Sequence, residues 1–359
     1  MDWDLALKAV IAVTPVIVLL FAFDRFDLFN LISLRWIAVL VVLGGAVAAA
    51  SFLVNWRVMD GFPIGFSSYS RYIAPPIEET LKGLLVVLLF ALNRIGFKLD
   101  AAVTGFAVGA GFSMVENAWF LTIQGDANVG AWLVRGLGTA VMHGGATALF
   151  ATVAHEMTER QAEGAAHSYR FNPLLFLPGL ALATALHSAF NHFAEQPLLA
   201  MILTFVLVPM TLLLVFTRGE QSATKWMEAD RTAHAQALAD IRAGAFAQSA
   251  TGQALNTLAH RFARHGRAAQ ADLMAYIELK TELVLRAEEI MLSADDNGQP
   301  GELAAPLTPQ PEDREKFDRL AALEAKLGKP LLRAIGPKLA FRRNDLWELQ
   351  RFRTRAFGG

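Results

Sequence analysis

The chain has 359 residues, 54% of them hydrophobic, and a formal net charge of −1, which gives no overall basis for binding nucleic acid. It contains no cysteine, which excludes disulfides, a cysteine nucleophile and a cysteine-ligated metal site. Residues 1–217 hold 11 Lys and Arg and 14 Asp and Glu, whereas residues 218–359 hold 21 and 19. We therefore expect a transmembrane domain over residues 1–217 and a cytoplasmic helical domain over residues 218–359.

The first domain consists of apolar runs of about 20 residues, the length that an α-helix needs to cross a bilayer. The run that comes first follows Asp2 and Asp4 instead of a basic segment, so we interpret it as a retained span and not as a signal peptide. The predicted fold class is all-α: a polytopic transmembrane helix bundle of about seven spans with a C-terminal soluble helical domain. The seven predicted spans are Leu5–Phe23, Leu34–Val54, Ile73–Leu92, Ala101–Ile123, Ala131–His155, Leu174–Phe193 and Leu198–Phe216.

Lysine and arginine gather in alternate loops between these spans. The loops after spans two, four and six hold only Arg57 and Arg71. The loops after spans one, three and five hold Arg25, Arg94, Lys98, Arg160 and Arg170. Because basic loops remain on the cytoplasmic side, we expect the N-terminus outside and the C-terminal domain in the cytoplasm.

The C-terminal domain carries apolar residues at helical spacing. This spacing predicts helices over Thr224–Ile241 and Gln253–Leu292, followed by shorter helices over Phe317–Leu327 and Asp345–Phe352. The segment Ser293–Pro311 is rich in proline, glycine and acidic residues, which is typical of a linker.

The third predicted span begins with two carboxylates and a lysine. Glu78 and Glu79 precede Lys82 by four and three residues, so either can pair with it on one helix face. An ion pair that caps the helix near the membrane surface would explain one carboxylate. Since Lys82 needs only one partner, the other carboxylate remains available to take a proton from water.

Three further spans carry ionisable or amide groups, which normally face a protein interior or a wet cavity. Glu116 lies inside the fourth span without a local cation, His143 lies midway along the fifth, and His187 and Asn191 are four residues apart in the sixth. Such a set could activate water for hydrolysis, hold a divalent metal such as zinc, or relay protons in a transporter. The spacing alone does not choose among these three uses.

Four motifs resemble those of a known family. EETLK at Glu78–Lys82 is similar to the EExxK motif of PrsW-type intramembrane proteases, and FSMVEN at Phe112–Asn117 resembles their FxxxEN motif. His143 in MHGGATALF and His187 in LHSAFNH resemble the two later histidine motifs, in the same order. The resemblance covers roughly residues 70–195. That family belongs to a superfamily with the CAAX prenyl proteases and the Abi immunity-type proteins.

The resemblance implies an intramembrane endopeptidase that hydrolyses a peptide bond of a membrane-anchored protein. Cleavage of an anti-sigma factor at the site-1 step is an activity found in the family. The expected location is a bacterial inner membrane, and the expected partners are membrane lipid and the protein substrate, with no nucleic acid. The alternatives are a proton-coupled transporter and a catalytically inactive scaffold that signals through its tail.

The resemblance also implies roles for single residues. Glu79, with Glu78 as the alternate, would be the base that activates water, and Glu116, His143 and His187 would line the catalytic cavity. Glu116, His143 and His187 would also be the ligands of a divalent metal such as zinc. The family's prenyl-protease relatives have been argued to work without a metal, so metal dependence stays open. We expect Glu79, Glu116, His143 and His187 to converge.

The remaining residues of the motifs have supporting roles in this interpretation. His187 and Asn191 would stabilise the oxyanion, and Lys82 would orient the two glutamates. Phe112 and Asn117 would support the site from the fourth span. Asn191 stands where the family also has an acidic residue, and the missing carboxylate weakens the interpretation of the cluster as a metal site.

Overall fold

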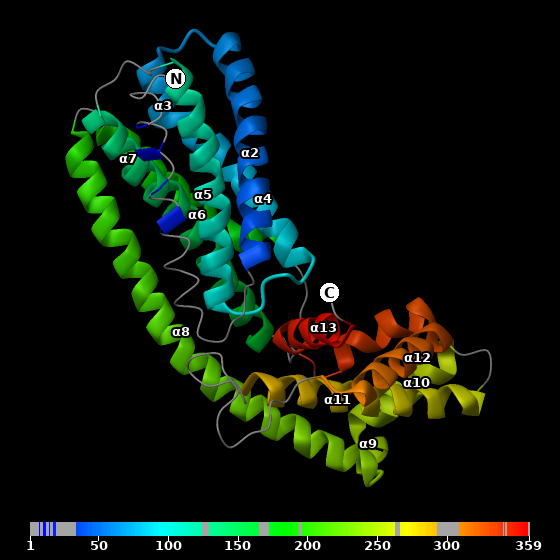
Figure 1. Cartoon of the computed structure of the whole chain (residues 1–359). Helices are drawn as coiled ribbons and strands as arrows, with labels where there is room; N and C mark the ends of the chain where they lie inside the picture. Colours follow the sequence, from blue (N-terminus) through cyan, green and yellow to red (C-terminus); the bar gives the residue numbers. More distant parts are fainter. Residues whose placement is uncertain are drawn as a thin grey trace. The chain divides into compact units, whose positions relative to one another are not determined.

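The computed structural model describes residues 34–123, 129–164, 172–193, 196–262, 266–292, 309–339, 341 and 343–357, together with residues 7, 10, 11, 14, 17 and 18. Within these residues every regular element is a helix and none is a strand (Figure 1), so the all-α prediction is confirmed. The chain divides into two compact units, Met1–Thr158 with Asn172–Glu220, and Glu159–Phe171 with Gln221–Gly359.

The N-terminal unit supplies the helices that are long and apolar enough to cross a membrane. In the described part of the chain these are Leu34–Gly61, Lys98–Ile123, Gly136–Glu159 and Pro173–His192. The first predicted span lies largely outside the described residues. The third predicted span is a helix that carries three ionisable residues, and the seventh contains a shorter apolar helix, Leu198–Thr211. The count of seven spans is therefore not confirmed and stays a prediction.

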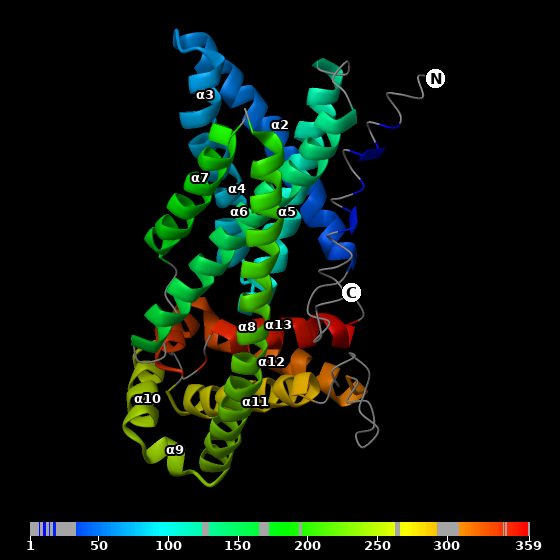
Figure 2. The same ribbon diagram turned by 90° about the vertical axis from the view of Figure 1, so that its left-hand side faces the viewer.

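The described residues of this unit include the helices α2 (Leu34–Gly61), α3 (Phe66–Tyr72), α4 (Ala74–Ala91), α5 (Lys98–Ile123) and α7 (Leu177–His192), the 3-10 turn η1 (Pro173–Phe176) and most of α6 (Val129–Gly164). The next helix, α8 (Pro197–Arg242), begins in it. In two views at right angles, α5 runs between α2 and α6 (Figures 1 and 2). A Cβ added to Gly111 would overlap the carbonyl of Val41 on α2, and one added to Gly109 would overlap that of His143 on α6. Glycine at these two positions thus lets the three backbones approach closely, as membrane helices often do.

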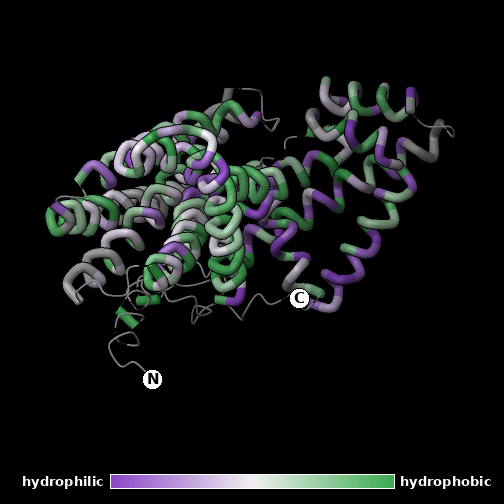
Figure 3. Tube along the Cα trace, turned by 90° about the horizontal axis from the view of Figure 1, so that it is seen from above, coloured by the Kyte–Doolittle hydropathy of each residue, from purple (hydrophilic) through white to green (hydrophobic). Residues whose placement is uncertain are grey.

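The outer surface of α8 in this unit is apolar. The tube in Figure 3 follows the Cα trace and is green at hydrophobic residues. The exposed ones on α8 include Leu198, Leu199, Ile202, Leu203, Phe205, Val206, Leu207 and Met210. A continuous apolar face of this kind is expected to meet lipid rather than water, which agrees with a membrane protein.

The C-terminal unit is a set of helices around its own apolar core. After α8 come α9 (Ala245–Gln248), α10 (Ala250–Phe262), α11 (Gly266–Leu292), α12 (Pro311–Ile335), η3 (Gly336–Lys338) and α13 (Arg343–Phe357). Helices α11, α12 and α13 contribute Tyr276, Ile277, Leu320, Ile335 and Phe352 to this core. The hydrophilic positions, purple in Figure 3, alternate with hydrophobic ones along these helices, as in an amphipathic bundle.

Several helix boundaries differ from the predicted ones. The predicted span Leu198–Phe216 and helix Thr224–Ile241 are one helix, α8, because no proline interrupts the residues between them. The predicted helix Gln253–Leu292 is two helices, α10 and α11. The predicted helix Phe317–Leu327 extends in both directions within α12, which kinks at Gly328, where φ is 76°. Most of the predicted linker Ser293–Pro311 lies outside the described residues.

Candidate functional site

Three ionisable side chains lie in the first turns of α4. Pro75 and Pro76 occupy the start of this helix, where proline is tolerated because the first N–H groups have no partner within the helix. Glu78, Glu79 and Lys82 are all buried, and Lys82 is 0% exposed. Lys82 follows Glu79 by one turn, and its Nζ donates to Glu79 Oε1 at 2.6 Å. Burying such charges is costly unless each is paired and hydrogen-bonded, so the other partners of these three side chains determine which of them is available for chemistry.

Glu79 and Lys82 connect α4 to the histidines of α6 and α7. His187 on α7 donates from Nδ1 to the same Oε1 of Glu79 at 2.8 Å. Lys82 Nζ also lies 3.0 Å from His143 Nδ1 on α6. An ammonium group only donates, so we assign His143 Nδ1 as the acceptor and place the ring proton on Nε2. That proton points at Glu116 Oε2 on α5, 3.0 Å away.

Aromatic contacts hold the rings of this cluster in place. The rings of His143 and His187 meet edge to face with their centroids 4.7 Å apart. Phe112 on α5 lies 4.9 Å from the His143 ring and 4.7 Å below the ammonium group of Lys82. The face of Phe112 therefore adds a cation–π contact to the buried lysine and limits the movement of His143.

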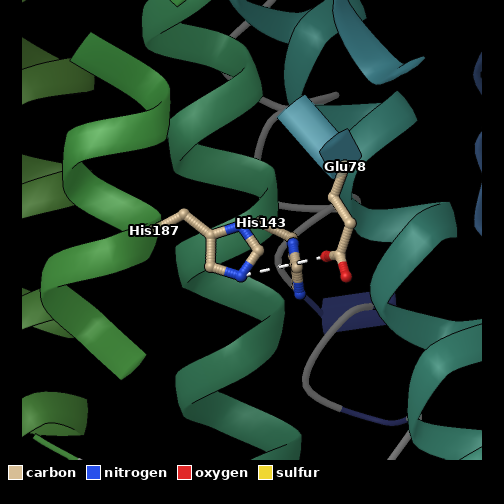
Figure 4. A group of neighbouring side chains, drawn as sticks. All are labelled: Glu78, His143 and His187. Carbon is tan, nitrogen blue, oxygen red and sulfur yellow. Dashed lines mark ion pairs between the residues drawn. The ribbon is translucent and has the colours of Figure 1, made fainter. Parts of the chain in front are cut away.

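Glu78 has one carboxylate oxygen engaged and one available. Its Oε1 accepts a hydrogen bond from Asn55 Nδ2 on α2 at 3.0 Å. Its Oε2 is buried and has no hydrogen-bonding partner among the described residues. His187 Nε2 lies 3.9 Å from this oxygen, and Figure 4 shows the two side chains directed toward each other. A distance of 3.9 Å is too long for a hydrogen bond, and a bound species between the two atoms would satisfy both.

Glu78, His143 and His187 form a group that could hold a metal ion, since one ligand atom from each lies within 4.8 Å of the others (Figure 4). A carboxylate and two imidazoles are a known donor set for catalytic zinc. His187 suits this role because Glu79 fixes its Nδ1, which leaves Nε2 to face Glu78. His143 would have to exchange its contact with Lys82 or Glu116 for the ion. The residues present therefore fit a divalent metal, with His143 the least ready ligand.

The residues expected to converge do so. Glu79, Glu116, His143 and His187 are joined by a continuous series of contacts that passes through Lys82. The group of possible metal ligands contains Glu78, whereas the resemblance pointed to Glu116 together with His143 and His187. Glu116 contacts His143 from the other side of the ring, with 24% of its side chain exposed, so the cluster reaches the protein surface there.

Asn191, predicted as a catalytic residue, and Asn117, predicted as a supporting one, both have structural partners. Asn191 donates from Nδ2 to the backbone carbonyl of Ser70 at 2.7 Å, which ties α7 to α3. In the described part of the chain its side chain has no contact with the glutamates and histidines of the site, so its predicted oxyanion role has no support from this geometry. Asn117 accepts a hydrogen bond from Thr139 Oγ1 at 3.1 Å, which ties α5 to α6.

Sequence reasoning missed Asn55 and Tyr69. Asn55 binds Glu78, and the hydroxyl of Tyr69 donates to Asn55 Oδ1 at 2.8 Å. Asn55 also lies 3.3 Å from Ser51 Oγ, one turn earlier on α2. Ser51 and Asn55 are four residues apart next to a long apolar stretch of α2, and this spacing was the signal that could have identified Asn55, because it marks a helix face that meets polar neighbours.

A protein-family model described as PrsW family intramembrane metalloprotease matches residues 33–216, just over half of the chain. The matched segment contains every residue of the cluster described above. No curated protein and no solved structure gives a significant match.

Proposed function

The chain belongs to the PrsW family of intramembrane metalloproteases, and from this premise we propose that it hydrolyses a peptide bond of a membrane-anchored protein at the Glu78–His187 pair. The family makes it a membrane protease. A membrane-anchored substrate of the anti-sigma-factor type, cut at the site-1 step, is part of the proposal. The proposal also places the protein in a bacterial inner membrane. The distribution of basic loops supports an orientation with the N-terminus outside and the C-terminal unit in the cytoplasm.

The observation that carries this proposal is the unpaired oxygen of Glu78. A buried carboxylate oxygen without a donor is costly, so it persists where a bound species satisfies it or where function requires it. Glu79 is different, because one of its oxygens already accepts from both Lys82 and His187. We therefore propose that Glu78 contacts the reacting water and that Glu79 positions His187. The resemblance had favoured Glu79 for the first of these roles, with Glu78 as the alternate.

The family description implies a metal, and Glu78, His143 and His187 would hold it. When bound, such an ion supplies a water of lowered pKa, about 7 in zinc enzymes. Around it, Glu79 accepts from His187 Nδ1 and so keeps Nε2 directed at Glu78. Lys82 neutralises Glu79, and Asn55 holds the second oxygen of Glu78.

The hydrolysis needs one proton transfer in each direction. The water oxygen attacks the carbonyl carbon of the scissile bond while its proton passes to a carboxylate. The bond from carbon to nitrogen then breaks as that proton reaches the leaving amine. Glu78 is this carboxylate if the site works without an ion, and Glu116, the partly exposed carboxylate next to His143, is the candidate base if Glu78 is a ligand.

Cleavage of co-expressed single-span membrane proteins tests the proposal, with Glu78→Gln and His187→Ala compared with the wild type. Glu156→Gln is the matched control, because this carboxylate pairs with Lys98 on the same bundle but is 36% exposed. We expect both site variants to lose cleavage at unchanged folding and the control to keep it. Full cleavage by Glu78→Gln would refute the role of its free oxygen.

Metal content measured on the same purified proteins separates the two forms of the mechanism. An ion bound by the wild type and lost in Glu78→Gln supports the ligand role of Glu78. If the purified wild type contains no ion and still cleaves its substrate in the presence of a chelator, the result supports the role of Glu78 as the base. A transporter or an inactive scaffold would show no cleavage with any substrate.

A further inference from the structure

The C-terminal unit contains a second group of buried ligand atoms, remote in sequence from the family motifs. His234 on α8 lies between two carboxylates: its Nδ1 is 2.7 Å from Glu288 Oε1 on α11, and its Nε2 is 3.4 Å from Asp345 Oδ2 on α13. One ligand atom from each residue lies within 4.8 Å of the others. The three residues are 8%, 1% and 1% exposed. Three helices thus bring one imidazole and two carboxylates to a single buried point.

A further carboxylate joins this group with an unpaired oxygen. Glu348, one turn after Asp345 on α13, is 2% exposed. Its Oε2 and Glu288 Oε2 are both buried and have no hydrogen-bonding partner among the described residues. The charges that act on Glu348 are those of Asp345, Glu288 and Asp230, all negative, and then that of His234. In the described part of the chain, the group and its neighbourhood therefore contain two buried carboxylate oxygens without a hydrogen-bonding partner.

A positively charged histidine alone does not balance this group. Even a doubly protonated His234 can donate only one hydrogen bond from each ring nitrogen. The imidazolium has two N–H groups, which reach Glu288 Oε1 and Asp345 Oδ2. Neither donor remains for the second oxygen of Glu288 or for Glu348. Lys280 also interacts electrostatically with Asp345, and it donates to the hydroxyl of Tyr276.

We propose that His234, Glu288, Asp345 and Glu348 form a binding site for a divalent cation in the C-terminal unit. Three carboxylates favour a hard ion, and the imidazole favours a first-row transition metal, so Mn²⁺ and Zn²⁺ suit the set better than Ca²⁺. The ion replaces the proton of His234 and satisfies the two free oxygens. Since its ligands come from α8, α11 and α13, it joins the ends of a segment of more than a hundred residues and stabilises the fold of this unit.

The full-length protein in detergent, depleted of metal with a chelator and dialysed against Mn²⁺, provides the test. The background is the double variant Glu78→Gln with His187→Ala, which removes ligands of the N-terminal site. We expect one Mn²⁺ per chain in this background and none after Asp345→Asn is added. His260→Ala is the matched control, because this histidine is exposed on α10, and it should leave the one ion bound.

Two measurements keep the outcome clear if Asp345→Asn folds poorly. Electron spin-echo spectra of bound Mn²⁺ in the double-variant background should show the nitrogen of one imidazole, and Mn²⁺ at about 100 times its dissociation constant should raise the melting temperature by about 5 °C or more. No bound Mn²⁺ or Zn²⁺ in that background, with a melting temperature unaffected by either ion, would overturn the proposal. Because the N-terminal ligands are absent from this background, the result is independent of the proposed protease site.

Discussion

Replacing Lys82 with methionine probes the centre of the candidate site. This lysine is 0% exposed and donates to Glu79 at 2.6 Å and to His143 at 3.0 Å. Methionine keeps most of the apolar stem and the contact with Phe112 but removes the charge, so Glu79 is left as a buried carboxylate without its cation. Breaking a buried pair in this way costs about 3–5 kcal/mol.

A second ion pair of the same length supplies the comparison. Lys98 Nζ lies 2.6 Å from Glu156 Oε2, but the two side chains are 35% and 36% exposed. Solvent screens such a pair, so Lys98→Met should cost less than about 1 kcal/mol. The two variants therefore differ in burial and hardly in geometry, and their difference isolates the effect of desolvation.

Thermal unfolding in detergent measures both effects, and adding Glu79→Gln to Lys82→Met completes the test. The neutral amide removes the unpaired charge, so the double variant should recover a large part of the lost stability while remaining inactive. Equal, small losses for Lys82→Met and Lys98→Met would refute the reasoning, because they would mean that Lys82 and Glu79 are not a desolvated pair.

Three further variants test the surroundings of the site. Gly109→Ala should lower the melting temperature and abolish cleavage, because the added methyl overlaps the backbone of His143, whereas Gly138→Ala meets only side-chain atoms from 3.3 Å and should be tolerated. Asn55→Ala should reduce the cleavage rate about 10-fold or more in a folded protein, since it removes a hydrogen bond to the charged Glu78; an unchanged rate would exclude that role. Asn191→Ala should lower stability with little change in the rate per folded molecule, and the opposite pattern would restore the oxyanion role.

The part of the site that lies within one helix was predictable from the chain. The three-residue spacing of Glu79 and Lys82 places both on one face of α4, and the observed ion pair follows from that spacing. The high cost of ionisable groups in apolar spans likewise distinguishes Glu116, His143 and His187 from their neighbours by residue type alone. These inferences succeed because they depend on helical periodicity and on solvation, which are properties of the local sequence.

The assignment of the two glutamates depended on tertiary contacts. Both have the same chemistry and stand side by side in the sequence, so local pattern cannot rank them. The two glutamates differ in their hydrogen-bonding partners, which lie far from them in the sequence. His187, 108 positions away, binds Glu79 Oε1, and Asn55, 23 positions away, binds Glu78 Oε1. The same holds for Asn191, whose side chain meets a backbone carbonyl 121 positions earlier.

The sequence by itself determined that the chain is helical, that its first part is apolar enough for a membrane, and which side chains are too polar to face lipid, because each property follows from residue type and short-range spacing. The tertiary structure decided which of those side chains touch, which glutamate oxygen stays free, and that His234, Glu288 and Asp345 meet in the C-terminal unit. The physical reason is that hydrogen bonds and ion pairs act over a few ångströms, whereas these partners lie from about twenty to about 120 residues apart in the sequence and are brought together only by helix packing.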